Sequence, residues 1–240
     1  MLYRAELSYK YTDLSALQSD PAVKIHGFLM DKIAPDLAEW LHQPQYHPYA
    51  LSCLHEKEGV LRLRISALTD RACGLIDTLC GLEQISLCGC PRPIQLTHVT
   101  VNKPIQYPEA ARCLSANKLR LTFETPAMYR SKGRFRNPPM PEKYFYSVLC
   151  KINTFEGLNL RWEDFLEGWD CCEVLDYSLS GHTHFLTGMA IPGMTGTMLL
   201  RIPQKNPHGD LLRTLLSYAV YSGLGAKTAL GMGGFSITPV

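Results

Sequence analysis

The run Gly223-Leu224-Gly225-Ala226-Lys227-Thr228-Ala229-Leu230-Gly231-Met232-Gly233-Gly234 lies near the end of the 240-residue sequence. Two Gly-apolar-Gly units bracket five residues, and one of the five is a lysine. Glycine has no Cβ atom, so its backbone reaches positive φ angles and packs close to a partner. A turn of such residues can direct several N–H groups at one anion. The run therefore predicts a backbone cradle for phosphate groups, made by Gly223, Gly225, Gly231 and Gly233 with Lys227 beside them.

Two common nucleotide-binding motifs do not fit this run. The dinucleotide motif G-x-G-x-x-G requires a third glycine where the chain has Thr228, and it follows a strand, whereas a helix is expected here. The Walker A motif requires a glycine before its lysine, and the chain has Ala226 there. Another interpretation stays open, in which the run is only a glycine-rich turn between a helix and a strand.

The composition is that of a globular protein with a core: 46% of the residues are hydrophobic and 19% are charged. A net charge of +2 does not by itself indicate a nucleic-acid partner, so clustering of the basic residues has to supply that evidence. No apolar run approaches the roughly 18 residues of a membrane span, so no membrane partner is expected. The nine cysteines are odd in number, follow no leader-like segment and form no C-x-x-C pair. We expect reduced thiols in a cytoplasmic protein, with no metal site and no cofactor.

The elements around the glycine run have a regular order. A helix is predicted from Asn206-Pro207 to Ala219 before the run, and a strand follows it at 234–238. Further upstream, the pattern predicts a strand at 117–124, a helix from Pro141, and strand-like residues at 171–202 that glycines and a proline break into hairpin arms. The second half of the chain therefore reads β-α-β-β-α-β.

The first half has the same order of elements. A strand at 2–9 is followed by a helix that begins at Asp20-Pro21 and breaks at Ala34-Pro35. Gln43–Pro48 is expected to be a loop. The remaining elements are strands at 49–54 and 60–67, a helix at 69–80 and strand residues at 83–103, before a proline-containing linker at 103–113. The sequence thus predicts an α+β fold of tandem ferredoxin-like (RRM-like) domains with antiparallel sheets, at 1–112 and 113–240.

A basic segment between residues 128 and 141 is the second candidate binding feature, and it is expected to be an irregular loop. Four cations recur there at every second residue, with Tyr129 and Phe135 between them: Arg130, Lys132, Arg134 and Arg136. Such a segment can bind phosphates and stack on bases, and Arg62, Arg64 and Lys227 are expected to extend it. An ordinary solvated, charged loop stays open as the alternative.

With these elements in place, the chain resembles the CRISPR-associated endoribonucleases that cut CRISPR repeat RNA, a family of the RAMP superfamily. The family pattern Gly-h-Gly-x(5)-Gly-h-Gly, in which h is apolar, is matched at every fixed position from Gly223 to Gly233. In the first half the resemblance rests on Ile33-Ala34-Pro35, Leu41-His42 and Pro48-Tyr49-Ala50-Leu51-Ser52. Residues 55–200 match only in the order of their elements.

The resemblance implies an endoribonuclease for precursor CRISPR RNA that needs neither metal nor cofactor. A ribose 2′-OH attacks the adjacent phosphate, which leaves a 2′,3′-cyclic phosphate and a 5′-OH and yields mature guide RNAs. The resemblance makes His42 the first catalytic candidate, because a histidine with a pKa near 6.5 can accept or donate a proton at neutral pH.

The chain departs from the family pattern at two points. Met30 stands where relatives often carry a tyrosine, and His26, one helical turn earlier, is expected to replace it. His47 stands where relatives carry a lysine, and its protonated ring is expected to take that electrostatic role. These departures leave open an inactive, RNA-binding structural subunit of a CRISPR effector complex. The sequence also leaves open whether the chain forms a homodimer.

Overall fold

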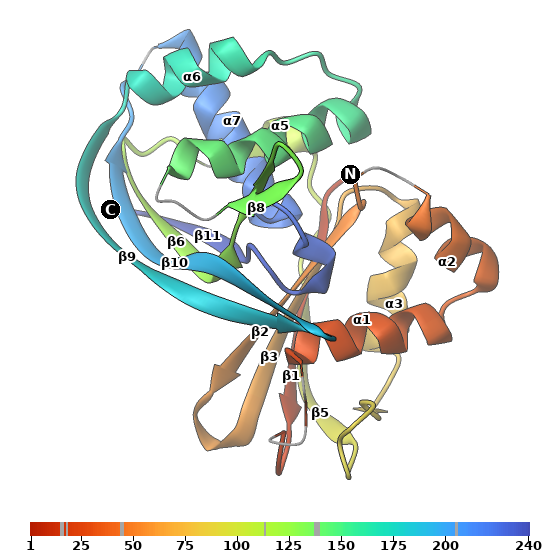
Figure 1. Cartoon of the computed structure of the whole chain (residues 1–240). Coiled ribbons are helices and arrows are strands. Elements are labelled where there is room, and N and C mark those ends of the chain that lie inside the picture. The colour runs from red at the N-terminus through yellow and green to blue at the C-terminus, as the bar shows by residue number, and fades with distance from the viewer. Residues whose placement is uncertain (15–16, 18, 44–45, 113, 137–139, 205) are drawn as a thin grey trace.

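The computed structural model describes residues 1–240 except 15–16, 18, 44–45, 113, 137–139 and 205. In the described residues two antiparallel sheets lie in the two halves of the chain, each with its own helices (Figure 1). The N-terminal sheet has the spatial order β2-β3-β1-β5-β4. Its strands are β1 (Tyr3–Lys10), β2 (Tyr49–Glu56), β3 (Val60–Ala67), β4 (Gln84–Ile85) and β5 (Ile94–Val101).

The helices of the N-terminal half lie where the sequence predicts, except that the first part of the helix predicted at 69–80 is a 3₁₀ turn at 71–73. They are α1 (Pro21–Lys32), α2 (Pro35–His42) and α3 (Gly74–Cys80), with single turns η1 (Lys57–Gly59) and η2 (Arg71–Cys73). The Asp20 side chain accepts a hydrogen bond from the Ala22 N–H at 2.9 Å and so caps α1. Ala34 has an extended ψ of 139° because Pro35 follows it, and this separates α1 from α2. The predicted break therefore places His42 at the C-terminal end of a short helix.

The C-terminal sheet has the order β11-β6-β10-β9. Its strands are β6 (Lys118–Ala127), β9 (Glu173–Leu186), β10 (Met189–Arg201) and β11 (Phe235–Pro239). Its helices are α5 (Pro141–Glu156), α6 (Trp162–Asp170) and α7 (Pro207–Ser222), followed by the turn η3 (Thr228–Leu230). In each half the first strand lies between the third and the last, which is the ferredoxin-like order. The predicted fold class is confirmed.

Three predicted segments differ from the structure. The expected linker contains the helix α4 (Tyr107–Arg112), which packs against α7. The expected irregular loop after β6 forms a small hairpin of β7 (Tyr129–Ser131) and β8 (Arg134–Arg136). β9 and β10 form one long hairpin that Pro192, Gly193 and Gly196 do not interrupt. At Gly196 a Cβ atom would lie 2.0 Å from the Ser178 carbonyl oxygen, so this glycine keeps two strands in close contact instead of ending one.

The two faces of the N-terminal sheet are used differently. One face carries leucines and isoleucines that form a core with α1 and α3. The opposite face carries buried or half-buried polar residues that meet the C-terminal half. Arg64 on β3 pairs with Glu6 on β1 and with Glu124 on β6, and the Arg4 guanidinium donates to the Val220 carbonyl at the end of α7. The two halves are therefore joined by charged side chains that form ion pairs or hydrogen bonds across the contact.

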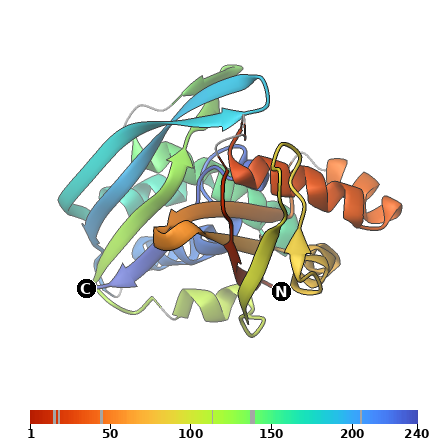
Figure 2. The same ribbon diagram turned by 90° about the horizontal axis from the view of Figure 1, so that it is seen from below.

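The long hairpin β9–β10 provides a second connection between the halves. Figure 2 shows its tip beside the start of α1. The Asp20 N–H donates to the Phe185 carbonyl at 2.8 Å. The ring of buried His184 lies 2.8 Å from the Leu230 carbonyl oxygen and 3.5 Å from the Asp20 carboxylate. One strand of the C-terminal half thus holds α1 and η3 together.

Three further features concern the cysteines, the length of the helices and the loop after α2. The described cysteines are free, and Cys113 lies outside the described residues. No helix within the described ranges is long and apolar enough to cross a membrane. Within the expected loop Gln43–Pro48, residues Pro44 and Gln45 are also outside the description.

Candidate active site

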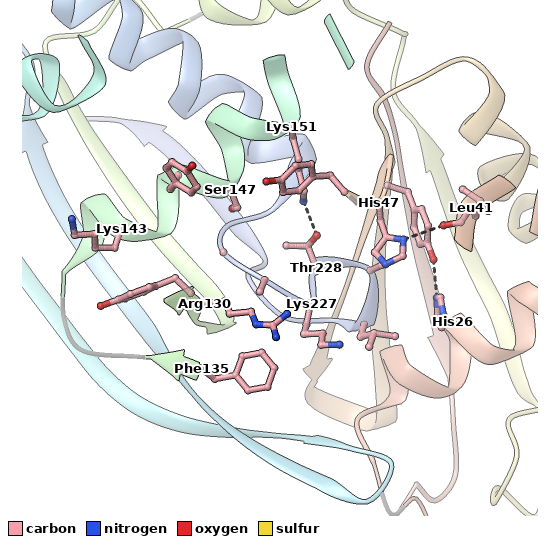
Figure 3. Close-up of a pocket in the computed structure, with 18 of the residues that line it drawn as sticks. His26, Leu41, His47, Arg130, Phe135, Lys143, Ser147, Lys151, Lys227 and Thr228 are labelled. Atoms are coloured by element: carbon pink, nitrogen blue, oxygen red, sulfur yellow. Dashed lines mark hydrogen bonds between the residues drawn. The ribbon is translucent and has the colours of Figure 1, made fainter. Parts of the chain in front are cut away.

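A cleft of about 1020 Å³ lies between the two halves (Figure 3). Residues from α1 and α2 line one side, β7–β8 and α5 line the other, and the segment 225–230 forms part of its wall. The described lining residues are His26, Met30, Leu41, His42, Tyr46, His47, Tyr49, Tyr129, Arg130, Ser131, Phe135, Lys143, Tyr146, Ser147, Lys151, Trp162 and Gly225 to Leu230. The cleft therefore brings the three predicted histidines together with part of the glycine run and part of the basic segment.

The charge of the cleft has one sign. Its described lining includes one arginine, three lysines and three histidines, but neither aspartate nor glutamate. Without an opposing carboxylate, the cations repel one another and favour an anionic ligand. The cleft is suited to a polyanion, although the net charge of the whole chain is only +2.

His42, at the end of α2, is exposed and lines the cleft. Its Nδ1 lies 2.6 Å from the carbonyl oxygen of Ala38. A carbonyl can only accept, so Nδ1 carries the hydrogen and donates it. In the neutral ring Nε2 then has a free lone pair. The helix end thus fixes the tautomer that can act as a base.

His26 and Tyr49 form a pair on the α1 side of the cleft. The Tyr49 hydroxyl lies 2.8 Å from Nδ1 of His26, and the two rings are stacked. Burial lowers the pKa of His26 to about 4, and the neighbouring His47 and His42 add to this effect. His26 is therefore neutral at neutral pH. Met30 also lines the cleft, so the predicted placement of His26 near Met30 is confirmed, while its chemical role stays a prediction.

His47 follows α2 and lies half-buried against Tyr49. Its Nδ1 is 3.2 Å from the Leu41 carbonyl oxygen. Burial lowers the pKa of His47 despite that hydrogen bond, and the nearby Lys151 and Lys227 lower it further. The expectation of a protonated His47 in place of a lysine is not supported, because the low pKa favours a neutral ring at neutral pH.

The glycine run does not form the predicted cradle of free N–H groups. The Gly223 N–H donates to Ala219, the Gly225 N–H to Tyr144 and the Gly233 N–H to Pro126, all at backbone carbonyls. All four glycines of the motif are buried and have positive φ angles between 67° and 95°. The predicted cradle of free N–H groups is therefore wrong for Gly223, Gly225 and Gly233, whose N–H groups bond to carbonyls inside the protein. The motif is instead a tightly packed turn between α7 and β11, as the open alternative allows.

The tight turn does present two side chains to the cleft. Lys227 has a left-handed φ of 62° and is exposed, and Thr228 follows it at the start of η3. A Cβ atom on Gly223 would lie 2.9 Å from Cγ2 of Thr228, so the missing side chain makes room for this threonine. The glycines thus act by placing Lys227 and Thr228.

Lys151 on α5 is a cleft residue that sequence reasoning missed. Its side chain is 3% exposed, and Nζ donates to the Ser222 carbonyl at 2.6 Å and to Oγ1 of Thr228 at 2.7 Å. Burial lowers the pKa of Lys151 to about 7. The sequence held one signal: Lys151 follows Tyr144 and Val148 by seven and three residues, so it falls on the apolar face of the helix.

The basic segment meets the cleft at one edge. Arg130 and Phe135 of the hairpin point into it, as Figure 3 shows. Lys132 lies at the exposed turn, and Arg134 and Arg136 are exposed outside the cleft lining. Residues 137–139 of the predicted loop lie outside the described residues. The hairpin is placed to extend the cationic surface beyond the cleft.

Two further arginines were expected to join this surface, and that expectation is wrong. Arg64 is held between Glu6 and Glu124 at the contact of the two halves, and Arg62 pairs with Glu56. The other half of the chain covers the polar face of β3, so Arg64 stabilises the fold and is not part of the binding surface. The strand pattern could not reveal this because the covering residues come from far along the sequence.

Aromatic rings complete the α5 side of the cleft. Tyr146 is 53% exposed and meets Trp162 edge to face with ring centroids 5.4 Å apart. The Lys143 ammonium lies 5.8 Å from the centroid of the Trp162 ring. Exposed rings beside cations are a favourable surface for unpaired bases and their phosphates.

The family model for "CRISPR-associated endoribonuclease Cas6" matches residues 121–235 of this sequence. A protein of that name from Streptococcus thermophilus is 25% identical over 238 residues, with 97% of both chains covered. One from Mycobacterium tuberculosis is 24% identical and covers 90% of this chain and 71% of its own.

Solved structures agree with the sequence matches. The structure of Thermus thermophilus Cas6 has 25% identity and a TM-score of 0.71, and covers 99% of this chain and 98% of its own. A Cas6 product complex has 23% identity and a TM-score of 0.79, with 99% and 100% of the chains covered. Over nearly its whole length in sequence, and in fold, this chain is similar to the Cas6 CRISPR-associated endoribonucleases.

Proposed function

We propose that the protein is an endoribonuclease that cuts precursor CRISPR RNA within each repeat without a metal ion. The Cas6 relatives support RNA cleavage, and structures of relatives in product and substrate-mimic complexes support RNA as the ligand. The observation that carries the proposal is the cleft itself, which joins His42 to a group of cations and has no carboxylate in its described lining.

In the proposed reaction the 2′-OH of one ribose attacks the adjacent phosphorus while the bond to the next 5′-oxygen breaks. The proton leaves the 2′-OH, and solvent water supplies a proton to the departing 5′-oxygen. The products are a 2′,3′-cyclic phosphate and a 5′-OH. Nε2 of His42 takes the proton of the 2′-OH, because Nδ1 carries a hydrogen that it donates to the Ala38 carbonyl oxygen.

The other groups of the cleft have roles that follow from their protonation. His26 is neutral and held by Tyr49, so it serves to position the nucleotide instead of supplying charge. The negative charge of the phosphorane is balanced by cations that the cleft already holds, Lys227 and Arg130. On this proposal His47 assists by hydrogen bonding through Nε2.

Cleavage of repeat RNA in EDTA tests the proposal. We expect the parent protein to cut each repeat at one position. The new 5′-OH should accept a kinase label directly, and the new 3′ end should resist ligation until the cyclic phosphate is opened and removed. His42→Ala should reduce the single-turnover rate by about 10²- to 10⁴-fold, the usual contribution of a general base. His98→Ala, at an exposed histidine of β5 outside the cleft, should cut like the parent.

Two results would contradict the proposal. Cleavage that stops in EDTA excludes the metal-independent mechanism, and His42→Ala cutting at the parent rate removes the base. The inactive structural subunit remains the second candidate because Met30, which cannot transfer a proton, lines the cleft. That candidate predicts tight RNA binding and no cyclic phosphate in the same assay.

A further inference from the structure

Among the lysines that the structure describes, Lys151 is unusual because its ammonium group is buried. Lysine is almost never fully buried unless it is paired. The groups bonded to Nζ are the Ser222 carbonyl and the Thr228 hydroxyl, which are both neutral. Among the described residues no carboxylate forms an ion pair with it. The buried charge is therefore hydrogen-bonded but has no counter-charge of its own.

The hydrogen bonds leave donors unused. An ammonium has three N–H donors, and two are accounted for by Ser222 and Thr228. When Nζ is an ammonium it cannot accept, so the Thr228 hydroxyl accepts that bond and its own hydrogen remains to donate. Both Lys151 and Thr228 line the cleft, as Figure 3 shows. One N–H and one O–H are thus available side by side in its wall.

We propose that Lys151 and Thr228 form an anion subsite that holds a phosphate oxygen of the bound RNA. Lys151 supplies the positive charge, and Thr228 supplies a hydrogen bond directed by Lys151. The inference rests on the proposed function and adds two residues that touch the substrate from the far half of the chain. In this arrangement the glycine motif serves the phosphate indirectly, since Gly223 makes the space that Thr228 occupies.

The surroundings of the subsite agree with an anion. Lys227 lies on the same turn as Thr228. His47 is close enough to both lysines for their charges to lower its pKa. Burial lowers the pKa of Lys151 to about 7, so the ammonium is costly to hold while the cleft is empty. A phosphate in contact with Nζ stabilises the charged form and removes that cost.

The test uses substitutions at both residues and two readouts. Thr228→Val removes the hydroxyl with little change in shape, Thr228→Ser restores it, and Lys151→Met removes the charge. Thr214→Val, at a half-buried threonine of α7 outside the cleft, is the matched control. The first readout is the single-turnover cleavage rate at saturating RNA. The second is the salt dependence of binding to repeat RNA that carries a 2′-deoxy residue at the cut position and so cannot be cleaved.

We expect Thr228→Val and Lys151→Met each to lower the cleavage rate about tenfold to a hundredfold, as for loss of a hydrogen bond to a charged group. Thr228→Ser should keep most of the rate. Lys151→Met should also reduce the slope of log affinity against log salt by about 0.7, the value for one phosphate of a single strand. A lysine with a purely structural role changes stability and leaves that slope as it is.

The outcomes separate this inference from the proposed function. A parent protein that cuts and binds, with variants that keep the parent rate and slope, overturns the subsite and leaves the proposed function intact. A parent that binds RNA without cutting overturns the proposed function, and the salt slope still decides the subsite. A parent that does not bind the RNA overturns both. Should Lys151→Met unfold, the comparison of Thr228→Val with Thr228→Ser decides alone.

Discussion

At Gly225 the backbone has a φ of 74°, and a Cβ atom would lie 2.0 Å from the Met128 carbonyl oxygen. Gly133 has a similar φ of 76°, but nothing lies within 4 Å of its would-be Cβ. The two residues differ in packing and share a backbone conformation. Together they separate the cost of a left-handed backbone from the cost of a steric clash.

We predict that Gly133→Ala lowers the free energy of unfolding by about 1–2 kcal/mol, the cost of a left-handed residue with a Cβ atom. Gly225→Ala should lower it by that amount and by about 1–3 kcal/mol more, because Met128 has to move. Urea unfolding followed by far-ultraviolet circular dichroism measures both. Equal losses in the two variants would show that the turn relaxes around the added methyl group.

A second residue-scale prediction concerns pH. Burial lowers the pKa of His26 to about 4 in the folded protein, against about 6.5 in an unfolded chain. Between those values the unfolded chain binds more protons, so stability rises as pH increases from about 4 to 6.5. His26→Gln cannot titrate and should flatten this part of the curve of melting temperature against pH. His98→Gln, at an exposed site, should leave the curve as in the parent.

At the scale of single residues, the sequence predicts local features but not contacts between residues that are far apart in the chain. The motif Gly223–Gly233 could be recognised because its spacing is local, and His42 could be placed at a helix end because Pro35 fixes where α2 begins. The partner of Thr228 could not be found, because Lys151 is 77 residues away and reaches it only through the packing of α5 on the glycine turn. The depressed pKa of His47 likewise depends on neighbours from both halves.

Among the elements of the cleft, the β7–β8 hairpin has a conformation that differs from the prediction. Its alternating arginines and lysine suggested an irregular loop, whereas Tyr129, Arg130 and Ser131 pair with Arg136, Phe135 and Arg134. Alternation is also what a two-stranded ribbon requires, and Gly133 at the turn has a positive φ angle that suits such a hairpin. The sequence therefore contains the hairpin signal, and the cations around the turn do not prevent the two short strands from pairing.

The hairpin's position predicts unequal roles for its cations. Arg130 lines the cleft and Lys132 lies at the exposed turn, so Arg130→Ala should weaken binding to uncleavable repeat RNA more than Lys132→Ala. Stability should stay within about 0.5 kcal/mol in both, since these are surface sites. Fluorescence anisotropy at several salt concentrations measures the affinities. Two variants that bind like the parent would support the solvated-loop interpretation of this segment.

For the whole molecule, the order of elements was predictable but the contact between the halves was not. Local patterns give each strand and helix, and their repeated order gives two ferredoxin-like units. Arg64 lies on the polar side of β3, where a single sheet with one wet face would leave it in water. It lies instead between Glu6 and Glu124, because the second half of the chain covers that face.

The ion pair of Arg64 and Glu124 is predicted to contribute to the free energy of unfolding through the contact between the two halves. Arg64→Ala should lower the free energy of unfolding by about 3 kcal/mol or more, because Glu124, only 12% exposed, loses its partner. Arg201→Ala, which removes an exposed pair with Glu173, should cost about 1 kcal/mol or less. Replacing Arg64 and Glu124 together by methionine should recover part of the loss. A loss for Arg64→Ala no larger than that for Arg201→Ala would show that the contact is solvated.

The long hairpin β9–β10 reaches from one half of the protein to the other, and the bonds of Phe185 and His184 fasten its tip to Asp20 and Leu230. Residues of α1 and η3 line the cleft, and both elements are bonded to the same hairpin, so the cleft keeps its width. On the proposed function, an RNA that enters the cleft adapts to the protein, so the bending falls on the nucleic acid. Selection among transcripts then depends on how readily each one deforms as well as on which bases it carries.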